Sequence, residues 1–588
     1  ALEIFERMSW YGWFTVMAVY VTGSRATGGL GFSTELRGTL QAIVPFFLYL
    51  LPVLTGALAD RYGFKRMFVL SFIVMIASYY MLGRFSSLPG FVLAFLFVAV
   101  GAAMFKPVVV GTVARVTNDS NSATGFGIFY MMVNVGGFVG PIAAGLVRGA
   151  GWEWVFIASS GWAAINLVIV LLFYKEPETA VDKRSLRDVL DGLVEVLGNG
   201  RFFLTVGVAL LGLVAASAFS SMGTSWFSWS RFGILFAVWI VVNLLYDAFL
   251  PAGSGRPDRK GPKPGFFMRR MRCGNWRFAL FLLILSGFWT SFEQIFLTMP
   301  EYIRDFVETR PIVRAAERVF GGGEPGDPDG GIASRIATVN RAERAEITRI
   351  LAELRETIGP GETAPGVSAA QREEALGGAS RELLQSKVRV APAELGRIAA
   401  SGDDLEEATG RIVSLGRQVN PEFIINLDSL GIICFQVLVS FFVGRLRRFT
   451  TIILGMTVAA VGVGLSMFAG TEGMVGAGGL VWVVCAGILI FSFGEMMASP
   501  TSQEYVGRIA PPDKKALYMG YYFVAGALGN LFAGILSGQM YGKLARDMER
   551  PDLMWAAFGG LMLFTAFVFL LYNRFAVPKE ADRRTSRV

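Results

Sequence analysis

Residues 3–12 read Glu-Ile-Phe-Glu-Arg-Met-Ser-Trp-Tyr-Gly and place three ionisable side chains at the head of an apolar run that continues past Tyr20. Ionisable and aromatic residues recur here at helical spacing and would share one helix face: Glu3, Glu6, Arg7, Trp10, Tyr11 and Phe14. Such a face cannot point at lipid, because an uncompensated charge in a bilayer is expensive. We therefore expect this helix to line a protein interior or a watery cavity, where a carboxylate pair beside a guanidinium can hold or release a proton.

The composition is typical of a membrane protein. The 588 residues are 53% hydrophobic and 17% charged, with a mean hydropathy of +0.51, whereas a soluble protein would carry more charge. The net charge of +8 comes from basic residues in short loops between apolar segments, which indicates membrane topology and no nucleic-acid partner. The chain has no His, and its 3 Cys lack metal-ligand spacing, so we predict no metal site and proton chemistry on carboxylates, Lys or Tyr.

Apolar segments long enough to cross a bilayer recur along the chain. The first six lie at 3–22, 36–59, 65–84, 89–114, 122–147 and 152–174. Two more lie at 202–222 and 231–250, and the last six at 276–303, 420–444, 449–469, 478–500, 514–540 and 552–575. We therefore predict an all-α membrane protein with about fourteen transmembrane helices, arranged as six, two and six.

Basic residues gather in alternate loops, which predicts the orientation. They lie at 61–66, 175–187, 256–277, 445–448 and 514–515, and Arg583 and Arg584 follow in the tail. Loops rich in Lys and Arg remain in the cytoplasm, so we predict that both termini are cytoplasmic.

Residues 304–420 interrupt the apolar pattern between the ninth and tenth predicted helices. They are polar and charged, with Gly and Pro near 321–330 and 359–366, and amphipathic helices are expected at 341–358, 369–388 and 405–415. The orientation places them outside the cytoplasm. They are either a solvated decoration or a cap or partner-binding domain over the outer mouth. They carry no Cys and no metal or nucleotide motif, and we predict no enzymatic activity.

The chain is therefore divided into five predicted parts. These are a six-helix bundle at 1–175, a linker with an inserted hairpin at 176–275, the first helix of a second bundle at 276–303, an extracytoplasmic and mostly helical insertion at 304–420, and the rest of the second bundle with a cytoplasmic tail at 421–588.

The loop at 56–66 reads Gly-Ala-Leu-Ala-Asp-Arg-Tyr-Gly-Phe-Lys-Arg and resembles the loop motif of the major facilitator superfamily. An acid at a helix end followed by bases can pair across the cytoplasmic face and lock one conformation, so Asp60 and Arg61 are candidate gating residues. The plainer interpretation is positive-inside anchoring. Arg445, Arg447 and Arg448 occupy the equivalent place in the second bundle, as expected for two related halves.

Five further motifs lie across both halves. They are Glu3-x-x-Glu6-Arg7 with Trp10-Tyr11-Gly12, Phe105-Lys106-Pro107, Phe129-Tyr130 with Asn134 and Gly136, Trp289 with Glu293-Gln294, and Gly494-Glu495 with Ser499-Pro500. Together they resemble the proton-coupled oligopeptide transporters, over essentially all of the chain except 304–420. The six-two-six order resembles bacterial members of that family. The resemblance implies two six-helix bundles in a bacterial inner membrane and proton-driven uptake of di- or tripeptides by alternating access, with a proton gradient and no cofactor.

The motifs also supply candidate site residues. For proton coupling they are Glu3, Glu6, Arg7, Lys106 and Glu293. For substrate binding they are Tyr11, Tyr49, Lys106, Tyr130, Asn134, Trp289, Glu495 and Ser499. Lys106 is a lone cation in an apolar helix and needs a counter-charge, for which Glu3 or Glu6 are the obvious partners. A static ion pair is the alternative, and each Tyr could equally pack at a helix interface.

Two departures from the family leave the substrate open. Phe14 stands where family members that take peptides usually carry Arg, and Asp428 and Ser429 stand where the family has an apolar residue and Pro. The main interpretation is therefore a proton-driven symporter of peptides or peptide-like solutes. The alternatives are the same fold moving or exporting a non-peptide solute, and a transporter-derived receptor in which 304–420 binds a partner.

Overall fold

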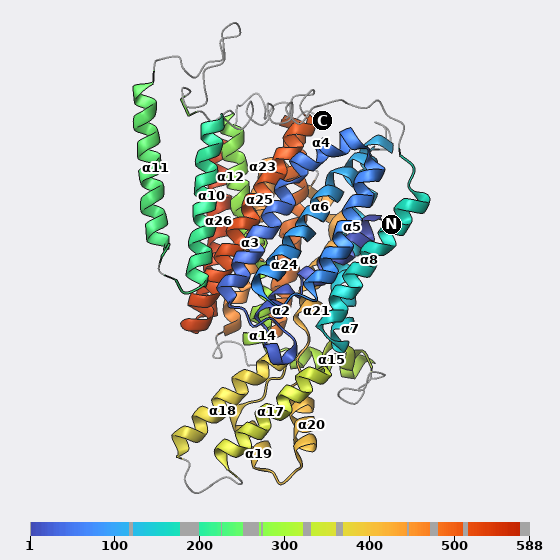
Figure 1. The fold of residues 1–588 in the computed structure, drawn as a ribbon, viewed down its shortest axis with the longest axis vertical. Helices are drawn as coiled ribbons and strands as arrows, with labels where there is room; N and C mark the ends of the chain where they lie inside the picture. Colours follow the sequence, from blue (N-terminus) through green and yellow to red (C-terminus); the bar gives the residue numbers. More distant parts are fainter. Residues whose placement is uncertain are drawn as a thin grey trace.

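The computed structural model describes residues 2–116, 122–176, 199–224, 226–250, 270–271, 275–320, 331–359, 368–443, 446–470, 480–509 and 515–576. Figure 1 shows an upright bundle of long helices with a smaller group of helices, α17 to α20, below one end of it. The predicted all-α fold is confirmed. Within the described ranges the pairing typical of strands is limited to an isolated antiparallel bridge between Val388 and Arg417.

The N-terminal half comprises the helices up to residue 173. They are α1 (Leu2–Phe14), α2 (Met17–Thr22), α3 (Thr34–Leu50), α4 (Pro52–Tyr62), α5 (Phe64–Leu82), α6 (Leu88–Val116), α7 (Ser122–Val147) and α8 (Trp152–Phe173). A 3-10 turn, η1 (Arg25–Thr27), connects α2 to α3. Ser33 caps α3 by accepting a hydrogen bond from the backbone nitrogen of Leu36, and Pro52 begins α4, as Pro commonly does in a first helical turn.

The C-terminal half comprises the helices on either side of the insertion at 304–420. They are α12 (Trp276–Phe292), α13 (Gln294–Leu297), α14 (Met299–Phe306), α21 (Pro421–Ile425), α22 (Leu427–Val443), α23 (Arg448–Leu465), α24 (Leu480–Ile509), α25 (Lys515–Met540) and α26 (Pro551–Phe575). The first predicted segment of each half is broken partway along, at Thr15–Val16 and again at Glu293 and Thr298. Matching interruptions are expected of two halves built on one plan.

Thirteen helices in the described ranges are long and apolar enough to cross a bilayer. Of the fourteen predicted segments, the one expected at 3–22 does not qualify. The structure divides it into α1 and α2, because the chain leaves regular helix at Thr15 and Val16. The other thirteen predicted segments each overlap a qualifying helix.

The inserted pair α10 (Gly200–Ser221) and α11 (Trp229–Phe249) stands at the edge of the bundle (Figure 1). α10 packs against α3 and α25, so it lies where the two halves meet, and the hydroxyls of Thr39 and Ser217 are hydrogen-bonded at 2.8 Å. α11 packs against α10 and has no buried residue.

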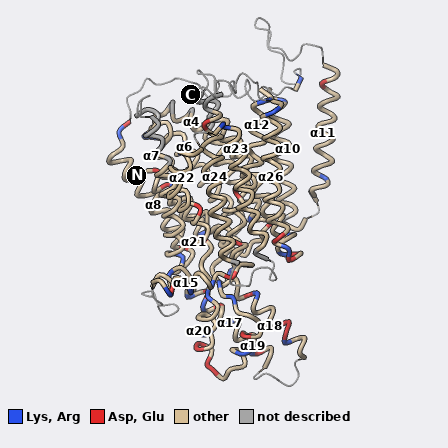
Figure 2. The backbone as a smooth tube through the Cα atoms, turned by 180° about the vertical axis from the view of Figure 1, so that it is seen from behind, with Lys and Arg blue, Asp and Glu red and all other residues tan. Residues whose placement is uncertain are grey.

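The insertion has a core of its own. Its helices are α15 (Arg310–Phe320), α16 (Ile332–Ile336), α17 (Arg341–Ile358), α18 (Ala369–Leu383), α19 (Pro392–Ala400) and α20 (Leu405–Gly416). Capping boxes start α17 at Asn340 and α18 at Ser368, each satisfying two backbone donors. Ile347, Leu383 and Ile412 are fully buried among the helices. Charged residues are dense in this part and sparse along the bundle (Figure 2).

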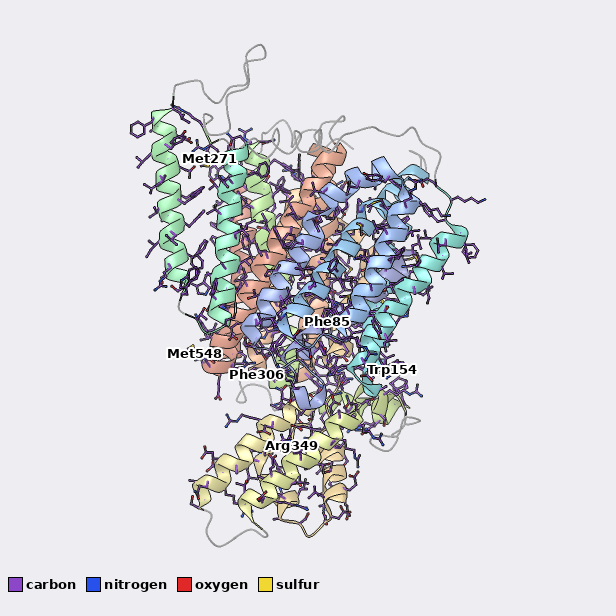
Figure 3. The ribbon with its side chains drawn as sticks, viewed as in Figure 1. Phe85, Trp154, Met271, Phe306, Arg349 and Met548 are labelled. Carbon is purple, nitrogen blue, oxygen red and sulfur yellow. The ribbon has the colours of Figure 1, made fainter. Side chains whose placement is uncertain are left out.

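The two halves are tied together at the end of the bundle that bears the insertion, called here the insertion end. The Nε of Arg37 on α3 lies 2.9 Å from the carboxylate of Glu301 on α14, and both side chains are fully buried. Arg148, just after α7, donates to both carboxylate oxygens of Glu422 on α21 at 3.0 Å. Buried pairs of this kind indicate that the insertion end is closed in this conformation. Trp154 and Phe306, labelled in Figure 3, lie near the junction with the insertion.

Glycines bring α3 and α25 into close contact at the same end. A Cβ on Gly38 would lie 2.4 Å from the carbonyl oxygen of Gly534, closer than real atoms approach. Gly38→Ala must therefore push the helices apart, and we expect it to cost about 1–3 kcal/mol of stability. The measurement is the melting temperature of the detergent-solubilised protein. Gly161→Ala is the matched control, because its Cβ would meet nothing within 4 Å. An unchanged melting temperature for Gly38→Ala would mean that the helices do not pack this closely.

Candidate functional site

The charged residues of α1 form a buried cluster. Arg7 pairs with the carboxylate of Glu6, and its Nε lies 3.3 Å from a carboxylate oxygen of Glu3. Glu6 is fully buried, and Glu3 and Arg7 are 7% and 6% exposed. One carboxylate oxygen on each acid, Oε2 of Glu3 and Oε1 of Glu6, has no hydrogen-bond partner. The cluster therefore retains acceptor capacity for a proton or a ligand.

Glycines of α7 allow α1 to lie this close. A Cβ on Gly136 would come within 2.6 Å of the backbone of Ile4 and the side chain of Arg7, and one on Gly140 within 3.0 Å of Met8 and Gly12. The motif around Asn134 thus has a packing role, because its glycines allow the charged helix α1 to pack closely against α7.

The shared face predicted for α1 is narrower in the structure. Trp10 and Phe14 stack on each other with ring centroids 4.7 Å apart and belong to the apolar core of the N-terminal half. Tyr11 stays half-buried on the polar side, with its ring 5.8 Å from the Arg7 guanidinium. Sequence spacing placed all these residues on one face, but a wide helix face can meet both the core and the polar interior.

Lys106 on α6 does not pair directly with Glu3 or Glu6 in this conformation, which differs from our expectation. Its ammonium lies over the ring of Tyr49 on α3, 3.7 Å from the centroid. Arg7 takes the ion-pair position instead, because it is on the same helix as both acids. Lys106 still lies close enough to interact electrostatically with Glu3, Glu6 and, across the halves, Glu293.

Glu293 lies at the break between α12 and α13. The Nδ2 of Asn530 on α25 donates to its carboxylate at 3.3 Å. Because the helix is interrupted there, Glu293 is held at the end of α12, one helical turn from Trp289. Asn530 carried no signal in the sequence, since its part in the site depends on contact between α12 and α25.

A second pair of acids lies on α22 and α24. Ser492 donates a hydrogen bond to Asp428 at 2.6 Å, and the carboxyl groups of Asp428 and Glu495 lie within interaction range of each other. Two neighbouring buried carboxyl groups disfavour each other's ionisation, because like charges repel. The sequence marked Asp428 as an extra acid, whereas Ser492 had no distinguishing signal.

Tyr11 connects these groups, because it lies within electrostatic range of Arg7, Glu293 and Glu495. The structure therefore brings Tyr11 and Arg7 of the N-terminal half close to Glu293 and Glu495 of the C-terminal half. The candidate residues that are half-buried are Tyr11, Tyr49, Lys106, Asn134, Trp289, Glu293, Glu495 and Ser499. Tyr522, which the sequence did not single out, lies near Ser499 and shares a hydrogen bond of 3.0 Å with the hydroxyl of Ser502. Tyr130, Asp60 and Arg61 lie outside the described side chains.

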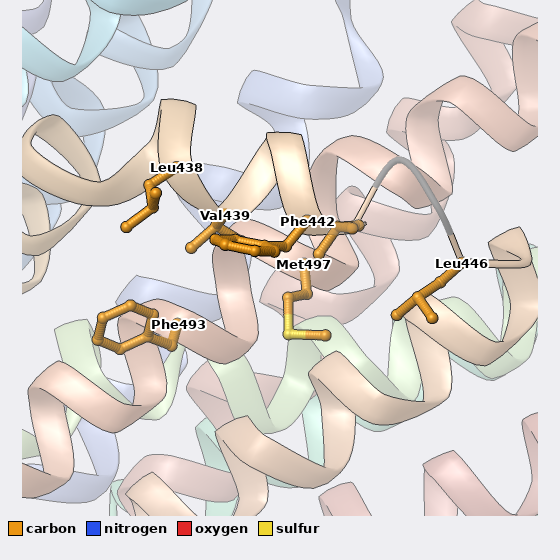
Figure 4. Close-up of a pocket in the computed structure, with 7 residues that line it drawn as sticks. Leu438, Val439, Phe442, Leu446, Phe493 and Met497 are labelled. Carbon is orange, nitrogen blue, oxygen red and sulfur yellow. The ribbon is translucent and has the colours of Figure 1, made fainter.

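A separate groove of about 360 Å³ between α22 and α24 is apolar (Figure 4). Its lining is Leu438, Val439, Phe442, Val443, Leu446, Phe493 and Met497. It offers no charge to a polar solute, so the charged centre is the better candidate site. Within the described ranges, no group of three or more acidic, Cys or His residues is placed to hold a metal ion.

Known proteins resemble this chain in sequence and in fold. The Major Facilitator Superfamily profile matches residues 4–292 and 418–587, on both sides of the insertion. A peptide transporter of Yersinia enterocolitica is 29% identical over 180 residues, which is 29% of this chain and 34% of that protein. A di-/tripeptide transporter of Lactococcus lactis is 26% identical over 213 residues, 33% of this chain and 42% of that one. The alignments thus span well under half of these curated relatives.

Solved structures show the same fold over nearly the whole chain. A peptide transporter, POT, in complex with sulfate superposes with a TM-score of 0.59 at 15% identity, covering 97% of this chain and 93% of that one. A POT family transporter in complex with 5-aminolevulinic acid gives 0.58 at 15% identity, covering 98% and 95%. The chain therefore belongs to the Major Facilitator Superfamily, and its similarities confirm the predicted resemblance to the oligopeptide-transporter branch.

Proposed function

We propose that the protein is a secondary active transporter that imports di-/tripeptides or peptide-like solutes together with protons, by alternating access. The observation that carries the proposal is the charged centre, to which each half contributes acids and the N-terminal half contributes Arg7 and Lys106. Buried ionisable groups in a membrane protein are expensive and are kept for binding or proton transfer. By the positive-inside tendency, the insertion end faces away from the cytoplasm of a bacterial inner membrane.

The two kinds of charge suit a zwitterionic ligand. In our proposal, Glu495 receives the amine, and Arg7 and Lys106 receive the carboxylate. A ligand that bridges both halves would favour closure around itself, because only differential contacts shift a two-state equilibrium. Arg7 is already paired with two acids, so the carboxylate end is the weaker part of the site.

Proton movement is assigned to the acids. Glu3, Glu6 and Glu293 are close to Lys106, so their protonation would change how strongly this cation is held and thus how it meets the substrate. Asp60 and Arg61 are proposed to stabilise one of the two conformations at the cytoplasmic face.

One observation favours a related substrate class. The Asp428–Glu495 pair makes the C-terminal side of the centre more acidic, and Phe14 on the N-terminal side is an uncharged residue of the apolar core. A site with more acids than free cations suits a small solute that binds mainly through its amine and only weakly through a carboxylate. 5-Aminolevulinic acid, bound by a transporter of the same fold, is an amine-bearing solute of that size.

The test is binding of a dipeptide and of its N-acetyl form to the wild type and to Glu495→Gln. Loss of the charged hydrogen bond should cost roughly 1.5–3 kcal/mol, or about ten- to a hundredfold in affinity. We expect N-acetylation and Glu495→Gln each to produce that loss in a calorimetric titration. Glu504→Gln is the matched control, because this acid is on the same helix but pairs with Arg448 at the surface. If N-acetylation and Glu495→Gln both leave the affinity unchanged, Glu495 does not bind the amine and a non-peptide solute becomes the preferred substrate.

A further inference from the structure

The insertion is anchored to the C-terminal half. It leaves that half after α14 and returns to it at α21. Next to these junctions, the backbone nitrogen of Asn420 donates to the carbonyl of Ile336 at 2.9 Å, and Arg389 donates to the carbonyl of Arg304 at 3.1 Å. The two covalent connections and these hydrogen bonds hold the insertion to the C-terminal half, so we expect the two to move together.

The insertion also contacts the N-terminal half. α17 packs against the turn η1, and α16 packs against α7. At the end of α7, a Cβ on Gly149 would lie 3.7 Å from the Cβ of Thr338 and 3.1 Å from its methyl carbon. Here the insertion and the N-terminal half are in van der Waals contact.

Four buried charges surround this contact. Lys387 of the insertion lies 3.0 Å from the carboxylate of Glu343, and both side chains are 2% exposed. The pair of Arg148 and Glu422, which joins the two halves, lies within electrostatic range of Lys387. Burial lowers the pKa of Lys387, an effect that Glu343 opposes. Lys387 also donates to the carbonyl of Thr338 at 2.6 Å. The ion pair of Lys387 is therefore connected to the residue that contacts Gly149.

A transporter that alternates must open this end. If the two halves rock as rigid bodies, the insertion end separates, and α7 and η1 move away from α14 and α21. The insertion cannot remain attached to both halves during that motion. Its contacts with the N-terminal half are the ones that release, because its attachment to the C-terminal half is covalent at two points.

We propose that the insertion is a strap of the gate at its own end of the bundle, bound to the N-terminal half in the closed state and released when that end opens. The strap rests on the alternating access in our proposed function, and it assigns 304–420 a role in this chain's own conformational cycle. It favours the closed state by the free energy of its contacts with the N-terminal half, which are Thr338 against Gly149, α16 against α7 and α17 against η1.

A disulfide tests the strap directly. In a background with Cys273, Cys434 and Cys485 replaced by Ser, Gly149→Cys and Thr338→Cys would place two thiols at a Cβ separation of 3.7 Å, inside the range for a disulfide. Ser537→Cys, at the buried site beside Arg37, reports opening through its alkylation rate and needs no substrate. On oxidation we expect this rate to fall by about tenfold or more and to recover with reductant, because the open state is removed from the equilibrium.

The matched control is Gly287→Cys with Thr565→Cys, which has the same Cβ separation of 3.7 Å but joins α12 to α26 within one half. Oxidation of this pair should leave the reporter rate unchanged. A formed Gly149–Thr338 disulfide with an unchanged reporter rate would overturn the strap. Uptake of a dipeptide is measured in parallel: if uptake is absent even in the reduced protein while the reporter still responds to the lock, the proposed substrate is wrong and the strap stands.

Discussion

Replacing Glu293 by Gln is expected to abolish concentrative uptake and to leave substrate exchange intact. Glu293 is an acid at the charged centre whose protein contacts are the Asn530 amide and the more distant Lys106. Gln has nearly the same shape and cannot take up a proton. For a one-proton symporter, each pH unit across the membrane contributes about 1.36 kcal/mol, or about tenfold accumulation. The accumulation ratio should therefore fall to about one.

The measurement uses proteoliposomes with an imposed pH gradient, followed by counterflow exchange without a gradient. Exchange should persist, because Gln resembles the protonated acid and the site can still reorient with substrate bound. Glu504→Gln is again the control and should accumulate substrate like the wild type. Accumulation by Glu293→Gln at the wild-type ratio would assign proton coupling to other acids, of which Glu3 and Glu6 come first.

Replacing Glu301 by Gln is expected to cause the largest loss of stability. It removes the carboxylate that faces the fully buried Arg37, and the guanidinium keeps only neutral partners such as the carbonyl of Leu297 and the hydroxyl of Ser537. Removing one member of a buried ion pair costs about 3–5 kcal/mol, because the other charge is left uncompensated. Chemical denaturation in detergent should show this loss.

The double variant Arg37→Met with Glu301→Leu separates the pair's own contribution from that penalty. Two apolar side chains of similar volume remove both charges, so we expect much of the lost stability to return. If the double variant is as unstable as the sum of the two single variants, Arg37 and Glu301 do not interact. The pair would then have no part in closing the insertion end.

Hydropathy was sufficient to find the spanning helices, because a backbone in lipid must satisfy its hydrogen bonds within the segment. The one segment that did not qualify, at 3–22, is the one that the structure divides into the two short helices α1 and α2. α17 begins and ends as predicted, at Arg341 and Ile358, because its capping box is a local signal. Motifs indicated the acids and cations of the centre for a similar reason, since the residues of each motif lie within a few positions of one another in the chain.

The sequence by itself therefore determined the family, the all-α membrane fold and the helices that carry charge. The tertiary structure decided which charges meet. Lys106 lies over Tyr49, Asp428 joins Glu495 and Ser492, and the insertion touches Gly149 of the other half. Each of these contacts joins segments that are distant in the chain. Hydropathy and motif spacing describe neighbouring residues only, so they cannot predict such contacts. Helix packing brings such residues together, because glycine-lined crossings set how closely two helices approach.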